Sequence, residues 1–255
     1  VRILEELRFP HSIGLLYSAF TYFTGFKVNS GEYKLMGLAP YGKPVYVDRI
    51  YDKLLDLRDD GSFRLDLDYF GYLDGLTMTN HRFDELFDGP PRKSESDLTQ
   101  REMDIAASIQ VVTEDIVLRM ARHARELTGE KHLCMAGGVA LNCVANGRLL
   151  HENIFDDIWI QPAAGDAGGA LGCALVAWHQ VKGNPRTADG RRDQMNGACL
   201  GPDFSDDEIG DFLQAKGYPA EKHDGPDWAR TIARLIAGEN VIGLCQGRME
   251  FGPRA

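Results

Sequence analysis

The fold is decided by residues 133–171, which read LCMAGGVALNCVANGRLLHENIFDDIWIQPAAGDAGGAL. Two similar units follow each other in this stretch. Each has a short apolar run, glycines where the run ends, and a segment typical of a helix directly after them. This repetition predicts strand, helix, strand and helix in succession up to about residue 182, and hence a parallel sheet with right-handed crossovers.

The first unit ends its strand at Gly137 and Gly138. A strand that stops at two glycines before a helix leaves unpaired backbone N–H groups and a positive dipole end facing one point, without a Cβ to block approach. We therefore predict a phosphate-binding turn, with Asn142, one turn into the helix, contacting a sugar or a base. The alternative is that the glycines only allow a helix to pack closely on the sheet.

The second unit carries Asp166, which is surrounded by Gly165, Gly168 and Gly169. A carboxylate at such a strand-to-helix junction suits a hard or borderline cation that bridges to phosphate oxygens. Asp at a helix start is also a common N-cap, which is the alternative role for this residue. The joint occurrence of the two glycine-rich units favours a nucleotide site.

Composition bounds the class of protein. With 255 residues, 44% of them hydrophobic and 26% charged, the chain matches ordinary globular proteins. Its net charge of −10 argues against a general nucleic-acid binder, which needs a basic surface. No apolar run approaches a membrane span of ~20 residues and no signal peptide opens the chain, so we expect a cytoplasmic protein. The five cysteines lack zinc or disulfide spacing and are expected to be small buried residues.

The remaining elements follow from periodicity and capping patterns. Helices are predicted at residues 13–23, 47–57, 81–87, 99–128, 205–216 and 228–237, and further strands at 62–67 and 241–245. Residues 25–42 are rich in Gly and Pro, which predicts a rigid loop that shapes a pocket. Within it Glu32 and Lys34 are candidate substrate contacts, the alternative being a solvated surface turn. His11 is a weaker candidate, because a His beside a Pro is more often structural.

We expect two domains, residues 1–190 and 191–255, with an insertion at 45–97. The boundary falls in a stretch rich in Gly, Pro, Arg and Asp that lacks periodicity. Near the end, Arg248 and Arg254 lie beside glycines, where guanidinium groups suit paired phosphate or carboxylate oxygens. Both ends look cut, so we expect the chain to be a piece of a longer protein.

Five blocks resemble a known family, the carbamoyltransferases typified by the nodulation carbamoyltransferase and the antibiotic O-carbamoyltransferases. The blocks are PHSIGLLYSAFT at 10–21, EYKLMGLAPYG at 32–42, MAGGVALNCVANG at 135–147, QPAAGDAGGALG at 161–172 and GRMEFGPRA at 247–255. They span nearly the whole chain in order, which is far more specific than a lone glycine motif.

The resemblance implies an enzyme of two parts. The first is similar to the threonylcarbamoyl-transferring universal protein, has the actin, sugar kinase and Hsp70 ATPase fold, carries iron, and moves a carbamoyl group from carbamoyl-adenylate to an acceptor hydroxyl. The second is similar to the threonylcarbamoyl-adenylate synthase and makes the adenylate from carbamoyl phosphate and ATP. Residues 1–190 would then be the C-terminal half of the first domain, and 191–255 a linker and the start of the second.

Carried over by position, Gly138 and Asn142 match the family's nucleotide contacts, with Gly137 beside them. Asp166 matches the acidic ligand of Fe²⁺ or another divalent cation, and Arg248 falls in the motif that opens the synthase-like domain. The family's paired-histidine metal motif is absent from this sequence. The resemblance therefore implies that this piece alone binds metal weakly and is inactive.

The implied co-substrates are ATP and carbamoyl phosphate, and the implied acceptor is a small molecule with a hydroxyl group, such as an antibiotic, a sugar or a lipo-oligosaccharide precursor. Neither a nucleic acid nor a membrane is expected as a partner, and a homodimer is among the assemblies that the resemblance admits. Two rival functions stay open: an ATP-dependent sugar or acetate-type kinase of the same fold, and a non-catalytic nucleotide-binding module.

Overall fold

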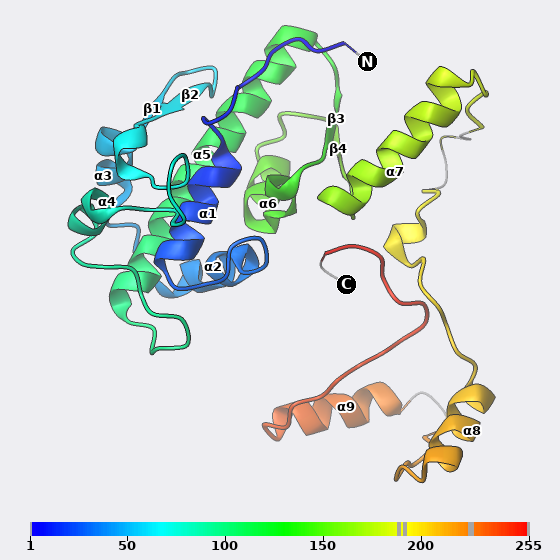
Figure 1. Cartoon of the computed structure of the whole chain (residues 1–255). Coiled ribbons are helices and arrows are strands. Elements are labelled where there is room, and N and C mark those ends of the chain that lie inside the picture. Colours follow the sequence, from blue (N-terminus) through cyan, green and yellow to red (C-terminus); the bar gives the residue numbers. More distant parts are fainter. Residues whose placement is uncertain (1, 188–189, 191–192, 224–226, 254–255) are drawn as a thin grey trace. The chain divides into compact units, whose positions relative to one another are not determined.

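The computed structural model describes residues 2–187, 190, 193–223 and 227–253. The chain forms two compact units, Val1–Ala164 and Gly165–Ala255, and each is described by itself (Figure 1). The domain boundary predicted after residue 190 falls between residues 188–189 and 191–192, which lie outside the described residues.

Unit 1 is built around its longest helix, α5 (Gln100–Thr128), as Figure 1 shows. The helix begins with a capping box, in which Thr99 and Glu102 satisfy each other's backbone N–H groups, and ends at Gly129 with φ 69°. The predicted helix at 99–128 is therefore confirmed. Its apolar residues recur every three or four positions, and four of them are fully buried: Ile105, Ile109, Val112 and Ile116.

Four shorter helices complete this core. They are α1 (Ile13–Phe23), α2 (Glu32–Leu38), α3 (Val47–Lys53) and α4 (His81–Leu86). Three of them, α1, α2 and α3, pack on α5, and the fourth, α4, packs on α1. Phe20 and Phe23 of α1 meet Phe83 of α4 and Phe87 just after it, with ring centroids 4.9–5.7 Å apart. The predicted helices at 13–23 and 81–87 are thus confirmed, and their aromatic contacts form the centre of the larger core.

The loop predicted at residues 25–42 is wrong in its central part. Helix α2 and a 3-10 turn at Ala39–Tyr41 occupy residues 32–41. Leu35 and Leu38, one turn apart, are buried in the core, and this burial outweighs the glycines in the segment. Pro40 lies in the first turn of the 3-10 helix, where no N–H group is needed.

The helix predicted at residues 47–57 is also wrong beyond Lys53. Strand β1 (Leu55–Leu57) follows α3 and pairs antiparallel with β2 (Phe63–Leu65) across the turn at Asp60 and Gly61. A 3-10 turn at Leu67–Tyr69 follows β2. Leu55, Phe63 and Leu65 are buried on one face of this hairpin. Alternation of apolar residues over only three positions is too short to tell a strand from the end of a helix.

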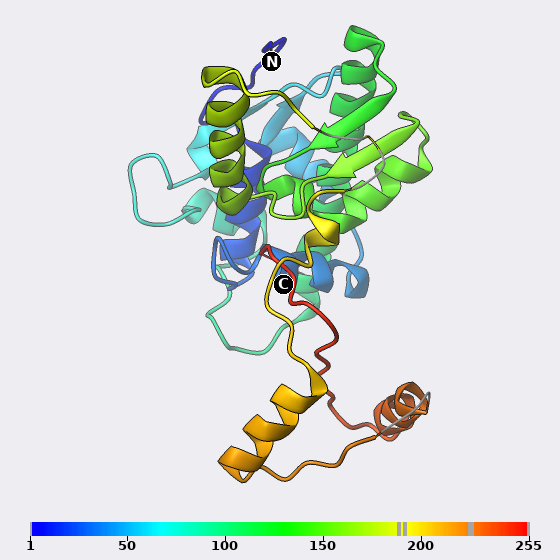
Figure 2. The same ribbon diagram turned by 90° about the vertical axis from the view of Figure 1, so that its right-hand side faces the viewer.

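The stretch 133–164 forms the parallel unit that the sequence predicts. Strand β3 (His132–Met135) pairs in parallel with β4 (Asp157–Ile160), and α6 (Cys143–His151) connects them, preceded by a 3-10 turn at Gly138–Leu141 (Figures 1 and 2). A second core lies between α5 and α6, and its buried residues are Val117, Leu118, Ala121, Ala145, Leu149 and Phe155. The α/β class is therefore confirmed, whereas the actin-like fold stays a prediction.

Unit 2 is helical in its described part. Helix α7 (Asp166–Val176) continues into a π-helical turn, Ala177–Val181, and a 3-10 turn at Asn196–Ala198, α8 (Asp206–Lys216) and α9 (Trp228–Ala237) follow. The predicted helices at 205–216 and 228–237 are confirmed, the first with its Ser205–Glu208 capping box. The strand predicted at 241–245 is wrong: among the described residues it has no pairing partner, and Val241 is fully exposed.

Among the described residues, the cysteines and the apolar character of the helices each bear on a general expectation. The cysteines are not buried: Cys134, Cys143, Cys173 and Cys245 are exposed and Cys199 is half-buried. Cys134, Cys143 and Cys173 lie on exposed positions of β3, α6 and α7, whereas Cys199 and Cys245 lie outside any helix or strand. Among the same residues, no helix combines the length and the apolar character that crossing a bilayer requires.

Candidate functional site

The turn after β3, residues 137–142, is called the glycine turn. Gly137 has φ 98° and ψ 160°, a conformation that side chains with a Cβ rarely adopt. The N–H of Gly137 donates to the carbonyl oxygen of Ala164 at 2.7 Å. The N–H of Gln161 donates to the carbonyl oxygen of Met135 at 3.0 Å. These bonds hold the carboxyl ends of β3 and β4 together, so the glycine turn begins at a fixed place.

Two N–H groups of the glycine turn point to no acceptor. The N–H groups of Gly138 and Val139 open the 3-10 turn, and neither finds a hydrogen-bond acceptor within the described part of the chain. A Cβ built on Gly138 would meet no atom within 4 Å. Open space beside two neighbouring N–H groups at the end of a parallel strand is suited to phosphate oxygens.

Asn142 lies before the helix and not one turn into it, which corrects the prediction for its position. It is the N-cap of α6, and its Oδ1 accepts from the N–H of Ala145 at 3.0 Å. The residue is 8% exposed. Residues Gly138–Leu141 form the 3-10 turn, so α6 begins only after them. The position directly before α6 is an N-cap, which favours Asn.

The side chain of Asn142 is paired with Gln110 of α5. Gln110 Nε2 donates to Asn142 Oδ1 at 3.1 Å, and Asn142 Nδ2 donates back to Gln110 Oε1 at 3.0 Å. With Ala145, the oxygen of Asn142 has two donors, and one of its two amide N–H groups is left for another partner. Asn142 can therefore offer a nucleotide a single N–H donor.

Sequence reasoning missed Gln110. It is 4% exposed and links three helices, because its Oε1 also accepts from Tyr17 of α1 at 3.2 Å and its Nε2 donates to Glu114 at 2.9 Å. Glu114 in turn accepts from Arg148 of α6 at 3.1 Å. The available signal was a polar residue directly after Ile109, within the buried part of the α5 pattern.

Asp166 is the first residue of α7 and is exposed. The N-cap is Gly165, so the alternative role of Asp166 as N-cap is wrong. No ion pair or hydrogen bond engages its carboxylate within the ranges that the structure describes. It lies in unit 2, whereas the glycine turn lies in unit 1.

The residues present do not fit a metal ion by themselves. Among the described residues, no three His, Cys, Asp or Glu side chains gather in a group that could hold one. A divalent cation is commonly held by three or more protein or water ligands. Asp166 thus offers one ligand, and the rest of a metal site would have to come from outside the described chain.

Arg248 lies on an exposed segment of unit 2. Its guanidinium donates to the carbonyl oxygen of Gly201 at 3.0 Å and lies 3.6 Å from the carboxylate of Asp203. Contrary to the prediction, no strand precedes Arg248 in the described part of unit 2. Both of its contacts are with a loop of the same unit. Arg254, the other predicted arginine, lies outside the described residues.

Comparison with known proteins identifies the family. The family described as "Carbamoyltransferase N-terminus" matches residues 1–175 of the chain. The chain belongs to the carbamoyltransferase family. The matched range includes the glycine turn, Gln110 and Asp166, and ends before Arg248.

Relatives of the chain align over nearly all of it. It is 61% identical to the protein sll1178 of Synechocystis over 98% of the chain and 41% of that protein. It is 40% identical to the nodulation protein NolNO of Sinorhizobium fredii over 97% of the chain and 34% of that protein. For the nodulation protein NolO of Bradyrhizobium diazoefficiens the identity is 37%, over 99% and 44%. The chain thus spans less than half the length of these relatives.

The two candidate substrate contacts, Glu32 and Lys34, lie on α2. The carboxylate of Glu32 accepts from Ser18 Oγ at 3.1 Å and from the N–H of Asn29 at 2.8 Å, which fixes the start of α2. Lys34 is exposed. Met36, on the same helix, brings its sulfur within 3.8 Å of the sulfur of Cys143, so α2 lies beside the start of α6. His11, the weaker candidate, has a structural contact, since its Nδ1 accepts from the N–H of Leu65 in β2 at 3.1 Å.

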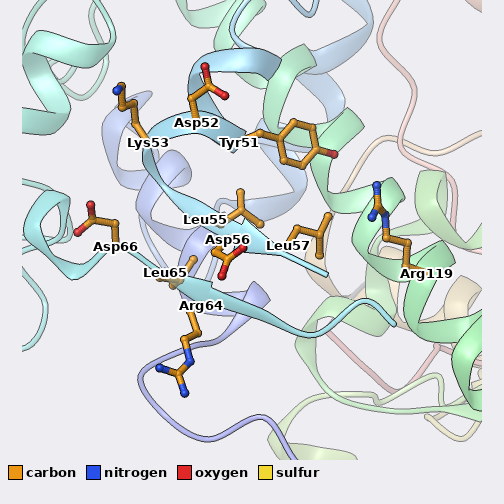
Figure 3. Close-up of a pocket in the computed structure, with 10 residues that line it drawn as sticks. All are labelled: Tyr51, Asp52, Lys53, Leu55, Asp56, Leu57, Arg64, Leu65, Asp66 and Arg119. Atoms are coloured by element: carbon orange, nitrogen blue, oxygen red, sulfur yellow. The ribbon is translucent and has the colours of Figure 1, made fainter. Parts of the chain in front are cut away.

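A cavity of about 690 Å³ lies elsewhere in unit 1, beside the β1–β2 hairpin (Figure 3). Its lining combines charges of both signs, including Lys53, Asp56 and Arg119, and contains none of the predicted site residues. Tyr51 at its edge donates to Asp115 at 2.8 Å; burial, and then this hydrogen bond, raise the pKa of the phenol well above its usual value. The phenol therefore stays protonated and donates to Asp115.

Proposed function

We propose that this chain supplies a nucleotide-binding part of an O-carbamoyltransferase. The full enzyme would form carbamoyl-adenylate from carbamoyl phosphate and ATP and move the carbamoyl group to a hydroxyl of a small-molecule or saccharide acceptor. The observation that carries the proposal is the glycine turn within the family match, where two neighbouring N–H groups have no acceptor among the described residues and a Cβ on Gly138 would meet no atom within 4 Å.

In the transfer step, the acceptor oxygen forms a bond to the carbamoyl carbon. The bond between that carbon and the phosphate oxygen of AMP breaks, AMP leaves with the electron pair, and the hydroxyl proton is released. The protein must hold the acceptor oxygen close to the carbon and stabilise the negative charge that develops on the departing phosphate.

The glycine turn would serve the second requirement. The N–H groups of Gly138 and Val139 would donate to phosphate oxygens, and the hydrogen bond from Gly137 to Ala164 fixes the start of the turn before the ligand arrives. The remaining N–H of Asn142 would donate to the sugar or base. Glu32 and Lys34 would lie toward the acceptor, since α2 lies beside the start of α6.

Fe²⁺ or another divalent cation remains part of the proposal only for a longer protein, because Asp166 would need further ligands. Arg248 remains a proposed nucleotide contact that would first have to leave Gly201 and Asp203. A homodimer is proposed as the assembly. Nucleic acid is not proposed as a partner, because the net charge is −10.

The proposal is tested by supplying ¹⁴C-labelled carbamoyl phosphate and ATP to the full-length protein with a panel of hydroxylated acceptors. Label on an acceptor together with release of AMP is the expected result. A phosphorylated acceptor would instead establish a kinase, and nucleotide binding without any product would establish a non-catalytic module. Gly210→Ala, at an uncrowded position in α8, is the control for Gly138→Ala in this assay.

A further inference from the structure

Gln110 lies far from the glycine turn in sequence but is joined to it by two hydrogen bonds. The amide groups of Gln110 and Asn142 face each other, and each donates to the other's oxygen at 3.0–3.1 Å. Such a reciprocal pair fixes which end of each amide is oxygen and which is nitrogen, because exchanging them on one side would oppose like atoms. The orientation of Asn142 is therefore set from α5.

The same pair determines the geometry on both sides of Asn142. The N–H of Asn142 donates to the carbonyl oxygen of Val139 at 2.9 Å, within the glycine turn. Its Oδ1 accepts from the N–H of Ala145, in the first turn of α6. Asn142 thus joins the turn to the helix, and a rotation of its side chain would release the cap.

Gln110 is itself held rigidly. Its Oε1 accepts from Tyr17 and Asn142, and its Nε2 donates to Glu114 and Asn142. The two acceptor and two donor positions of the amide are therefore all used. Both Gln110 and Asn142 are buried, at 4% and 8% exposure. A buried amide in a satisfied network costs free energy to rotate, because rotation leaves polar atoms without partners.

We propose that Gln110 is a positioning residue for nucleotide binding: through Asn142 it holds the glycine turn in the arrangement that presents the N–H groups of Gly138 and Val139 and orients the free N–H of Asn142. Gln110 does not itself touch the nucleotide. This role rests on the proposed function of the glycine turn.

The test compares Gln110→Met with the control Ser108→Ala in the full-length protein, and ATP binding is measured by calorimetry. Met keeps the length of the Gln side chain but has no N–H donor. Ser108 is also buried on α5, where it donates to the carbonyl oxygen of Asp104 and accepts from the N–H of Tyr46. Ser108→Ala removes hydrogen bonds of the same helix that do not reach Asn142.

We expect Gln110→Met to weaken ATP binding about threefold to tenfold, the effect of losing one or two hydrogen bonds, and Ser108→Ala to leave it unchanged. In an Asn142→Ala background, Gln110→Met should cause no further loss, because it acts through Asn142. An equal loss in that background, or the same loss from Ser108→Ala, would overturn the positioning role.

Amide hydrogen exchange supplies a second readout that needs no ligand. Gln110→Met should speed exchange at Ala145 about tenfold or more relative to the amides of α5, since only the cap is released. Uniform exchange changes would contradict the role, and failure of the unaltered protein to bind ATP would overturn the proposed function as well.

Discussion

The turn after β3 and the segment after β4 are both rich in glycine, but they differ in how their polar groups are held. In the glycine turn, Gly137 is tied to Ala164, and Asn142 is buried and paired with Gln110. In the second segment, residues 165–169, the helix α7 has no side-chain cap, and Asp166 is exposed.

The difference follows from how deeply the helix after each segment is buried. The glycine turn leads into α6, whose Ala145 and Leu149 are buried against α5. Helix α7 has no buried residue among those described. A turn on a packed core is organised before a ligand binds, whereas a carboxylate on an unpacked helix start is free to take a partner. The two segments thus suit different tasks: the first presents fixed N–H donors, the second an available ligand.

The largest effect is expected from Asn142→Ala, which attacks the organised turn. The change removes the cap of α6, worth about 0.5–2 kcal/mol, and leaves two of the four hydrogen-bonding positions of the buried Gln110 amide without a partner, worth about 1–3 kcal/mol. The free energy of unfolding should fall by about 2–4 kcal/mol, measured by urea denaturation monitored by circular dichroism. Asn142→Asp keeps the cap acceptor and should lose less; a loss below about 1 kcal/mol for Asn142→Ala would show that the turn is held by other contacts.

The next effect concerns Gly137, whose φ of 98° favours glycine. Gly137→Ala forces a Cβ into a backbone conformation that costs about 1–3 kcal/mol, even though open space surrounds the position. The unfolding free energy should fall by that amount in the same urea titration. Unchanged stability would mean that the turn relaxes to another conformation, and the contrast with the second segment would lose its basis.

Gly138→Ala separates ligand approach from stability. Gly138 has no left-handed φ and no crowding, so Ala should leave the unfolding free energy unchanged or raise it by up to about 1 kcal/mol. The added methyl group would stand where a phosphate must approach the N–H groups, and ATP affinity should fall about tenfold or more. Calorimetry on Gly138→Ala and on Gly210→Ala gives the comparison; equal affinities would exclude this face of the turn as the phosphate site.

The location of the glycine turn was predictable because it depends on local signals. Two apolar runs that end at glycines, with helical patterns after them, predict parallel strands, and the parallel pairing of β3 with β4 confirms this prediction. Gly129 and Ser205 likewise marked helix ends through local capping chemistry.

The rest depends on contacts that sequence order hides. Gln110 and Asn142 are 32 positions apart, and nothing in either local pattern predicts that they pair. Residues 32–38 became helical because Leu35 and Leu38 are buried against elements distant in sequence, which overrides the local preference for a loop. The strand predicted at 241–245 had the right residue types, but no neighbouring strand pairs with it in the described part of unit 2.

The smallest effect on stability is expected at Asp166, and it sharpens the comparison most. Asp166 and Asp206 are both exposed first residues of eleven-residue helices, α7 and α8, so both interact with the helix dipole to a similar, small extent. Asp166→Asn and Asp206→Asn should each change the unfolding free energy by less than about 0.5 kcal/mol. In the full-length protein, only Asp166→Asn should weaken binding of a divalent cation, measured by calorimetry with Mn²⁺. Equal Mn²⁺ affinities of the two variants would exclude Asp166 as a metal ligand. The second segment would then have no separate task to set against the glycine turn.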